Sequence, residues 1–513
     1  MAEGTYVGAI DQGTTGTRFM VFDHGGRVVA EAYERHEQYY PQSGWVEHDP
    51  LEIWARTKEV TRQALDAAGL DASQLAAIGV TNQRETTLVW DAATGEPIYP
   101  AIVWQDRRTT DRVEELEASG LAGTIREKTG LQVDAYFSAT KVEWILDNAD
   151  PIETDRGDGK DVRERAADGE LLFGTVDSWL IYNLTGEHVT DVTNAARTML
   201  FDVHRLEWDD DLLAEFGVPP AMLPEVRPSS DADYYGYTDA DGFLGTEVPV
   251  AAALGDQQAA LFGQTCFDPG DAKNTYGTGS FFLMNTGTEA VDSDHGLLTT
   301  VGFQRSGEPV QYALEGSIFA TGAAIEWLED VDLIDEPGDT ERLARSVDST
   351  GGVYVVPAFT GLGAPHWDGR ARGTVVGLTR DTGKAHLVRA TLEAIAYQTR
   401  DVAEAMTADA GIEISELRVD GGAVKNDFLC QLQVDVLGTD IARPEVDETT
   451  ALGAAYAAGL AADYWEDVDE LRENWRVDRR FEPSMDRAEA DRKYERWGEA
   501  VERSLDWARE DDA

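Results

Sequence analysis

The stretch that most constrains the fold of this chain lies near its N-terminus, where two short apolar runs flank a turn rich in glycine and threonine. The apolar runs are Val7–Ile10 and Phe19–Phe22, and the turn contains Gly13 and Gly16. Two apolar runs on either side of a short polar loop predict a β-hairpin. Since glycine carries no Cβ, the backbone at the tip of this hairpin could pass close to a ligand.

The side chains at the tip suit a phosphate group. Thr14 and Thr15 add hydroxyl donors to the exposed backbone N–H groups of the turn, and Arg18 adds a positive charge. Asp11 stands at the end of the first strand, where it could bind a magnesium ion that bridges phosphates. A surface hairpin with an ordinary tight turn explains this stretch equally well, so other parts of the chain are needed to decide between the two.

A third strand over 27–34 and a helix from Pro50 to Gly69 are predicted next. Asp49 would cap the N-terminus of the helix, Pro50 suits its first position, and Glu52 would complete a capping-box-like pair. Gly69 is typical of a helix end. The residues expected on the buried face are Ile53, Val60, Ala64 and Ala67.

Two buried strands further along end directly in polar residues. Leu75–Val80 leads into Thr81–Glu85, and Ala251–Gly255 leads into Asp256 and two glutamines. The alternation of strand, helix and strand favours an α/β fold, in which ligands bind beyond the carboxyl ends of the strands. An isolated pair such as Arg84–Glu85 is often a solvated surface pair, but its place at a strand end favours a role in a site.

The second half of the chain repeats features of the first. Asn274–Met284 is another turn rich in glycine and threonine followed by an apolar run, which indicates an internal repeat of the opening hairpin. Leu417–Asp420 predicts a strand that runs into Gly421 and Gly422, which would open a helix at a ligand edge. Lys384–Asp409 predicts a long helix. The buried face of this helix should contain Leu392, Ile395, Val402 and Met406.

These elements predict three consecutive parts. We place the main domain boundary after residue 260, with a second domain over 261–464 and a charged, helical C-terminal appendage over 465–513. Residues 151–170 are polar and charged. This composition predicts a surface excursion from the first domain.

The composition adds one strong constraint, a formal net charge of −54 on 513 residues. Like charge at this density opposes a compact fold at ordinary ionic strength, whereas at about 1 M salt the Debye length falls to roughly 3 Å and screens the repulsion. We therefore expect a protein of a salt-loaded cytoplasm, as in halophilic archaea. The acidic residues are spread along the chain, which disfavours a nucleic-acid mimic or a polycation-binding tail.

Other features indicate a globular cytoplasmic protein. Hydrophobic residues make up 42% of the chain, and no apolar run approaches the roughly 20 residues of a membrane span. The N-terminus does not resemble a signal peptide. Cys266 and Cys430 lack metal-ligand spacing and are expected to be buried free thiols. We expect neither membrane insertion nor binding of nucleic acid.

Several common catalytic motifs are absent from the sequence. It contains no Walker A motif, no GxGxxG dinucleotide fingerprint, no HExxH and no GxSxG. What remains is two turns rich in glycine and threonine, a diglycine, and three acids at strand ends, Asp11, Glu85 and Asp256. Phosphoryl transfer fits this set, because donors must surround the phosphates, carboxylates must hold Mg²⁺, and one acid must accept the proton of the acceptor hydroxyl.

Five segments then make a family resemblance specific. They occur in the order Asp11–Thr15, Thr81–Glu85, Gly255–Gln258, Tyr276–Gly279 and Asp420–Val424. Together they resemble signature segments of the FGGY family of carbohydrate kinases, in the actin/Hsp70/sugar-kinase superfamily, and among its members those that phosphorylate glycerol. The resemblance covers nearly the whole chain and implies an α/β fold with two ribonuclease-H-like domains flanking a nucleotide cleft.

The resemblance also implies ligands. ATP would lie in the cleft and glycerol deeper inside the first domain, so that the first domain binds polyol and phosphates and the second binds the nucleotide. The positions that match the polyol-binding set are Arg84, Glu85, Tyr136, Asp256 and Gln257. Trp104 and Phe281, which would otherwise be taken as core aromatics, would cover the carbon face of the polyol. The positions that match the nucleotide-binding set are Thr14, Thr15, Gly16, Arg18, Thr278, Gly322, Glu326, Gly422 and Asn426.

The resemblance assigns roles to the acids as well. Asp256 would be the general base, and Asp11 with Asp256 would bind Mg²⁺. The chain departs from the family at Glu326, where members carry glutamine, so the nucleotide contact there is altered or lost.

The predicted reaction is the ATP-dependent phosphorylation of glycerol to sn-glycerol 3-phosphate. The nearest alternative is a kinase for another polyol or for a ketose such as xylulose. An actin- or Hsp70-like ATPase that serves as an assembly or binding protein is a third possibility, although it leaves Arg84, Glu85 and Gln257 unexplained. A homodimer or homotetramer is expected, since both are common in the family.

Overall fold

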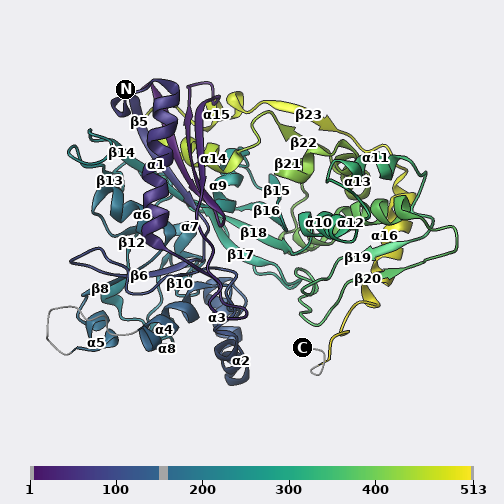
Figure 1. Ribbon diagram of the computed structural model, residues 1–513, viewed down its shortest axis with the longest axis horizontal. Helices are drawn as coiled ribbons and strands as arrows, with labels where there is room; N and C mark the ends of the chain where they lie inside the picture. Colours follow the sequence, from purple (N-terminus) through teal and green to yellow (C-terminus); the bar gives the residue numbers. More distant parts are fainter. Residues whose placement is uncertain (1–4, 150–159, 510–513) are drawn as a thin grey trace.

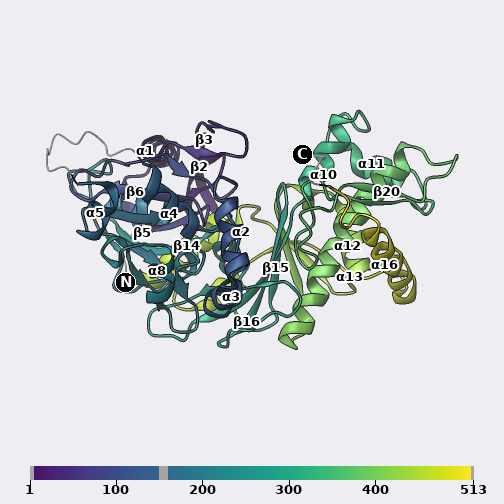
Figure 2. The same cartoon turned by 90° about the horizontal axis from the view of Figure 1, so that it is seen from below.

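The computed structural model describes residues 5–149 and 160–509, and it shows an α/β fold built on two large β-sheets (Figure 1). The first half of the chain and most of the second half lie side by side, as two views show (Figures 1 and 2). The α/β class predicted from the sequence is therefore confirmed. Within the described ranges, no helix is long and apolar enough to cross a membrane.

The first sheet grows from the predicted N-terminal hairpin. Its strands, in spatial order, are β13 (Gly236–Tyr237), β14 (Pro249–Gly255), β5 (Leu75–Asn82), β1 (Tyr6–Gln12), β2 (Gly16–Phe22) and β3 (Val28–Arg35). β1 pairs antiparallel with β2 and parallel with β5, and β5 pairs parallel with β14. Side chains of β1 alternate between two buried cores, with Val7 and Ala9 on one face and Ile10 on the other. Both faces of the sheet are thus covered.

The second sheet repeats the strand order of the first and has one further strand at its edge. Its strands, in spatial order, are β17 (Leu298–Phe303), β18 (Gln311–Ile318), β16 (Ser280–Gly287), β15 (Ala272–Tyr276), β21 (Leu417–Asp420), β22 (Ile441–Pro444) and β23 (Val477–Phe481). The hairpin β15–β16 corresponds to β1–β2, and β21 and β22 lie parallel to β15 as β5 and β14 lie parallel to β1. The internal repeat indicated by the two Gly/Thr turns is confirmed.

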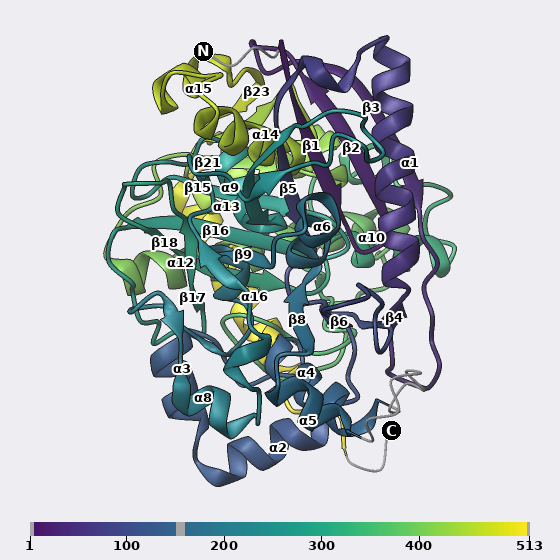
Figure 3. The ribbon, with the colours of Figure 1, turned by 90° about the vertical axis from the view of Figure 1, so that its left-hand side faces the viewer.

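Helices cover both faces of the first sheet. α1 (Pro50–Ala68) and α6 (Val176–Thr185) share a core with its outer face, and Figure 3 shows α1 running along β2 and β3. α9 (Asp256–Gly263) and α14 (Thr449–Ala461) contribute to a core that contains residues of both sheets. These two helices therefore lie between the sheets.

α9 and α14 pack with their backbones in close contact. A Cβ on Gly453 of α14 would overlap the carbonyl oxygen of Ala259, and a Cβ on Gly263 of α9 would overlap that of Thr449. α14 thus belongs to the second half of the sequence but packs on the first sheet. The domain boundaries after residues 260 and 464 remain a prediction, and core packing crosses the first of them.

The two long helices test the sequence patterns. α12 (Lys384–Ala410) begins at the predicted residue and ends one residue later than predicted, and its four predicted core residues are all buried. It covers the far face of the second sheet together with α13 (Asp427–Leu437). Both cysteines are buried and free, as predicted.

α1 begins and ends as predicted, but two details differ. Asp49 accepts a hydrogen bond from the N–H of Leu51, whereas the Glu52 carboxylate accepts from the N–H of Glu37 and pairs with Arg56 instead of completing a capping box. Ala67 is exposed, so its predicted burial is wrong. The buried face, which packs on β2 and β3, includes Thr57, Thr61 and Leu65 instead.

A smaller sheet and several helices complete the first half. The sheet contains β4 (Glu47–His48), β7 (Ala101–Ile102), β6 (Thr87–Asp91) and β8 (Leu171–Thr175). The helices are α2 (Thr110–Ser119), α3 (Ala122–Thr129), α4 (Ser138–Asn148), α5 (Val162–Ala167), α7 (Val192–Ala195) and α8 (Asp210–Glu215). Two short strand pairs are also present, β9 (Val189–Asp191) with β12 (Glu225–Arg227) and β10 (Phe201–Asp202) with β11 (Glu207–Trp208). Of the excursion predicted over 151–170, residues up to 159 lie outside the described ranges. α5 instead buries Val162 and Ala166, so the later part of that prediction is wrong.

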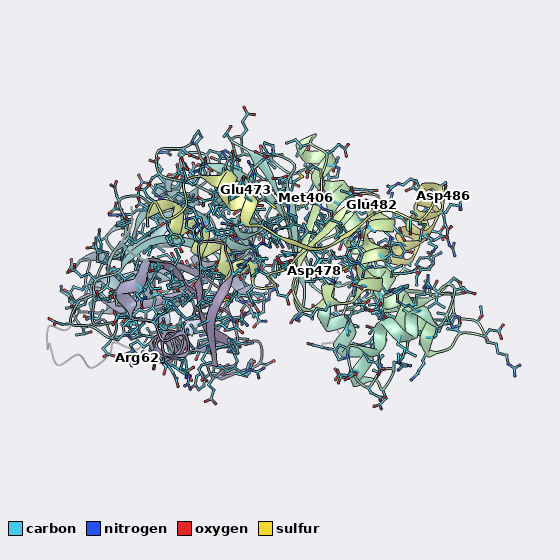
Figure 4. All side chains as sticks on the ribbon, turned by 90° about the horizontal axis from the view of Figure 1, so that it is seen from above. Arg62, Met406, Glu473, Asp478, Glu482 and Asp486 are labelled. Atoms are coloured by element: carbon cyan, nitrogen blue, oxygen red, sulfur yellow. The ribbon has the colours of Figure 1, made fainter. Side chains whose placement is uncertain are left out.

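The C-terminal segment is more than a helical appendage. Between α15 (Val468–Asn474) and α16 (Arg487–Glu502) it forms β23, which pairs antiparallel with β22. Figure 4 shows this segment, labelled from Glu473 to Asp486, crossing from the first half of the molecule to the second. The remaining elements of the second half are α10 (Gly322–Asp330), α11 (Asp339–Arg345), β19 (Tyr354–Val356) and β20 (Thr374–Val376).

Candidate functional site

Three parallel strands of the first sheet deliver polar side chains to one edge. β1, β5 and β14 are neighbours, with Asp11 opposite Thr81 and Asn82 opposite Gly255. The segments that follow these strand ends carry Arg84, Glu85 and Asp256. The predicted convergence of these residues at the carboxyl edge of the sheet is therefore present in the structure.

Arg84 is the centre of a buried ionic network. Its two terminal nitrogens donate to the carboxylate of Glu315 at 2.5 and 2.9 Å, and its Nε lies 3.2 Å from Asp256 Oδ1. The guanidinium lies over the ring of Phe281, 5.7 Å from its centroid. With its side chain only 1% exposed, Arg84 is held rigidly by the carboxylate and the ring.

Two residues of this network escaped the sequence reasoning. Arg197 donates from Nε to Glu85 Oε1 at 2.8 Å and from Nη2 to Glu315 Oε1 at 3.2 Å. The two arginines lower the pKa of Glu315 to about 2 against the effect of burial. Neither residue belongs to a motif, but each is a single charge inside a run of apolar or small residues, and that was the available signal.

Aromatic rings border this network. Trp104 and Tyr136 pack edge to face with centroids 5.4 Å apart, and Arg197 lies 6.0 Å from the centroid of Tyr136. Trp104 Nε1 donates to the hydroxyl of Thr14 at 2.9 Å. The aromatic corner is thereby joined to the tip of the first hairpin.

Asp256 and Gln257 open α9 beside the network. The Asp256 side chain is 31% exposed, and burial of the carboxyl group raises its pKa, while Arg84 opposes the shift. Lys273, another residue that sequence reasoning missed, donates from Nζ to Gln257 Oε1 at 2.5 Å. Because the amide oxygen is taken, the NH₂ group of Gln257 is left to donate elsewhere.

The first glycine–threonine turn is compact. The N–H of Gly13 donates to the carbonyl of Gly16 at 2.9 Å, and a Cβ on Gly16 would overlap β3. The Thr15 hydroxyl lies 3.2 Å from the hydroxyl of Tyr33. Arg18 forms an ion pair with Glu448, at the start of α14.

The second turn lies at the end of β15 and holds the start of α10. The N–H of Gly277 donates to the carbonyl of Gly279 at 2.8 Å, and Gly322 donates to the carbonyl of Gly277 at 3.0 Å. Thr278 is exposed in this turn, and Glu326 is exposed one turn further along α10.

The diglycine lies beside the second turn. Gly421 has a φ of 94°, and a Cβ there would overlap the carbonyl oxygen of Tyr276. Gly422, in contrast, faces open space. Asn426 caps α13 by accepting from the N–H of Leu429 at 3.0 Å, so this predicted nucleotide residue also has a structural role.

The turns of the two sheets meet at the start of α14. Arg18 of the first hairpin pairs with Glu448, and the hydroxyl of Thr449 donates to Asp420 Oδ2 at 2.5 Å. Asp420 is the last residue of β21, immediately before the diglycine. Adjacent residues of one helix end therefore contact the Gly/Thr turn of one sheet and the diglycine of the other.

The family of the chain follows from comparison with known proteins. Residues 6–263 match the N-terminal domain of the FGGY family of carbohydrate kinases, and residues 272–462 match its C-terminal domain. This chain belongs to the FGGY family. The predicted family, and with it the pair of actin/Hsp70-like domains, is confirmed.

Individual relatives in this FGGY kinase family are close. The chain is 74% identical to a glycerol kinase of Haloquadratum walsbyi over 99% of both chains, and 74% identical to one of Haloferax volcanii over the full length of both. Both are halophilic archaea, as the charge predicted. Among solved structures, Plasmodium falciparum glycerol kinase with ADP has a TM-score of 0.90 at 36% identity and covers 98% of both chains.

Asp11 and Asp256, the predicted metal ligands, influence each other electrostatically in this FGGY kinase. Burial raises the pKa of Asp11 to about 7; the charges of Glu448 and Asp256 add to the shift, and Arg18 opposes it. No group of three or more metal-binding side chains gathers within the described ranges. A magnesium ion here would thus have two carboxylates and would take its other oxygens from phosphates and water, which is its usual arrangement at nucleotides.

Proposed function

We propose that this FGGY kinase transfers the γ-phosphoryl group of ATP to a terminal hydroxyl of glycerol and produces sn-glycerol 3-phosphate. The observation that carries the proposal is the buried network of Arg84, Glu85 and Asp256, which is bordered by aromatic rings and joined to a Gly/Thr turn. A small polyol needs donors and acceptors at fixed places, and each unmatched buried partner is costly. The names of the relatives support the same reaction.

The polyol would lie against the network. Arg84 and Gln257 supply donors, and Glu85 and Asp256 supply acceptors. Tyr136 would also bind the polyol, and Trp104 and Phe281 would cover its carbon chain. Removal of water from this corner would keep water from accepting the phosphoryl group.

The nucleotide would lie across the turns that meet at α14. Its β- and γ-phosphates would contact Thr14, Thr15, Gly16, Arg18 and Thr278. Its adenosine side would contact Gly322, Gly422 and Asn426, and the contact at Glu326 would be altered or lost, because a carboxylate stands where family members carry glutamine. The open space at Gly422 supports this placement.

Asp256 would act as the general base. Its raised pKa makes it a better proton acceptor than an ordinary aspartate, and Arg84 orients the carboxylate through Nε. Asp11 and Asp256 would hold Mg²⁺, which when bound neutralises charge on the phosphates.

We also propose that the protein is cytoplasmic and forms a homodimer or homotetramer. Light scattering in concentrated KCl would measure the mass of the oligomer.

Substitution of Asp256 tests the assignment. We expect Asp256→Asn to lower kcat by roughly 10²- to 10⁴-fold, because proton acceptance is lost, while binding of MgADP measured by calorimetry persists. Turnover close to that of the wild type would remove Asp256 as the base.

A substrate panel tests the reaction. Glycerol, a longer polyol, xylulose and a blank without acceptor would be compared at low and high KCl, with ADP quantified by chromatography so that no coupling enzyme is exposed to salt. We expect ADP release to require glycerol. Preference for xylulose would favour the ketose kinase, and equal release in the blank would favour an ATPase.

A further inference from the structure

A buried histidine lies beneath the tip of the first hairpin. His48, the second residue of β4, is 0% exposed. Its Nε2 lies 2.7 Å from Gln38 Oε1, and its Nδ1 lies 3.4 Å from Gln83 Nε2. His48 is thus bonded to two carboxamides from two different segments.

Both carboxamides hold carbonyl groups of the Gly/Thr turn. Gln38 Nε2 donates to the carbonyl of Thr14 at 2.8 Å. Gln83 Nε2 donates to Gln12 Oε1 at 3.0 Å and to the carbonyl of Gly13 at 3.3 Å. The hydroxyls of the turn are not part of this layer, since the Thr14 hydroxyl accepts from Trp104 and the Thr15 hydroxyl lies beside that of Tyr33. His48 therefore lies one layer behind the proposed phosphate contacts.

The hydrogen-bonding roles in this layer are determined by its neighbours. Gln38 donates an amide N–H to the carbonyl of Thr14, so its amide oxygen faces His48 and accepts a hydrogen bond from the Nε2–H group of the histidine. Nδ1 then carries the lone pair, and it shares the two Nε2 hydrogens of Gln83 with Gln12 Oε1 and the carbonyl of Gly13. Burial, together with the ring of His36 at 4.5 Å, lowers the pKa of His48 to about 3, which keeps this neutral form at working pH.

We propose that His48 is a positioning residue for the phosphates of the nucleotide, acting through Gln38 and Gln83 on the carbonyls of Thr14 and Gly13. The proposal rests on the function proposed above, in which this turn binds ATP. The turn has two glycines and one backbone hydrogen bond of its own, from the N–H of Gly13 to the carbonyl of Gly16. Side-chain amides hold its carbonyls, with Gln12 donating to that of Gly13 at 2.8 Å beside Gln83, so the supporting layer contributes to its shape. Loss of the layer would loosen the turn but leave the polyol network of Arg84 and Glu315 in place.

Three substitutions separate the two arms of His48. His48→Gln can keep a donor near the position of Nε2 and hence the Gln38–Thr14 arm. His48→Asn can keep an acceptor near the position of Nδ1 and hence the Gln83–Gly13 arm, and His48→Leu removes both. We expect His48→Leu to raise KM for ATP about tenfold, as the loss of one or two buried hydrogen bonds would, and the other two variants to lie between it and the wild type. KM for glycerol should stay within about twofold.

A double-mutant cycle tests whether His48 acts through Gln38. If it does, Gln38→Leu combined with His48→Leu should raise KM for ATP by less than the product of the single effects. His188 provides the control, since it is a largely buried histidine whose Nε2 lies 2.8 Å from the carbonyl of Phe173, outside this layer. His188→Gln should leave KM for ATP unchanged.

The outcomes distinguish the two proposals. Equal rises in both KM values, additive effects in the cycle, or a folded His48→Leu protein with unchanged KM for ATP would overturn the role of His48. If His48→Leu does not fold, the Gln and Asn variants carry the test. A wild-type protein that fails to bind MgADP in calorimetry would instead overturn the proposed function.

Discussion

Glu315 shows how a single residue can organise a site. It receives Arg84 and Arg197, which are separated from it by 231 and 118 residues along the chain. A carboxylate that is 0% exposed is stable only while such partners surround it. The positions of both arginines, and through them of Asp256 and Glu85, therefore depend on this one side chain.

The pKa of Glu315 gives a prediction for stability. Its folded pKa of about 2 lies below the ordinary value of 4.5, so Glu315 stabilises the fold above about pH 4.5, and this contribution is lost as the pH falls through about 2. Over this range the shift corresponds to roughly 3 kcal/mol. We expect Glu315→Gln to lower the free energy of unfolding by about this amount at pH 7.

Denaturant unfolding at constant high KCl measures this difference. The difference in the free energy of unfolding between the wild type and Glu315→Gln should decrease as the pH falls from 5 toward 2. Glu308→Gln is the control, because Glu308 is 46% exposed and pairs with Arg305 at the surface, where an ion pair contributes little. A gap that does not depend on pH would contradict the ionic role of Glu315.

At the level of single residues, the sequence predicts only part of the site. Asp11, Arg84, Glu85 and Asp256 follow strand ends, a local feature, and the structure brings them to one edge. Arg197 and Glu315 were not predicted, because their importance arises from contacts between distant segments. No local pattern encodes such a pairing.

Among the elements, α9 and α14 make the most demanding contact. Gly263 and Gly453 let the two backbones approach so closely that neither position has room for a Cβ. Gly453→Ala should therefore destabilise the protein by about 3 kcal/mol, the upper range for overpacking a core. Thermal unfolding in concentrated KCl is the measurement.

A second glycine serves as the matched control. Gly498 lies within α16, and a Cβ there would meet no atom within 4 Å. Gly498→Ala should stabilise the protein by about 0.5 to 1 kcal/mol, since alanine favours the helix. If both substitutions had the same small effect, the contact of α9 with α14 would not be tight.

Local signals predicted the elements with regular patterns. The hairpins, α1, α12 and β5 carry clear periodicity, turn glycines or caps, and they form as expected. β23 was not predicted, because the run Val477–Phe481 is charged and only its pairing with β22 makes it a strand. Edge strands of this kind depend on a partner that is distant in sequence.

For the molecule as a whole, the net charge of −54 predicts dependence on salt. At 0.1 M ionic strength the Debye length is about 10 Å, so like charges on neighbouring elements repel, whereas at 1 M it is about 3 Å. We expect the melting temperature and the kinase activity to rise together between 0.1 and 3 M KCl. Sucrose at matched water activity should raise the melting temperature and the activity less than KCl does, because sucrose does not screen charge. Full stability and activity in dilute buffer would refute this adaptation.

The position of α14 also has a consequence for biosynthesis. The helix that completes the cover of the first sheet ends at Ala461, so the ribosome must translate the chain as far as this residue before the sheet can be closed. Until then the nascent N-terminal half exposes the apolar face that α14 later buries, including Val7 and Ala9. An early-terminated product ending near residue 260 would therefore be a client for chaperones rather than an independent domain.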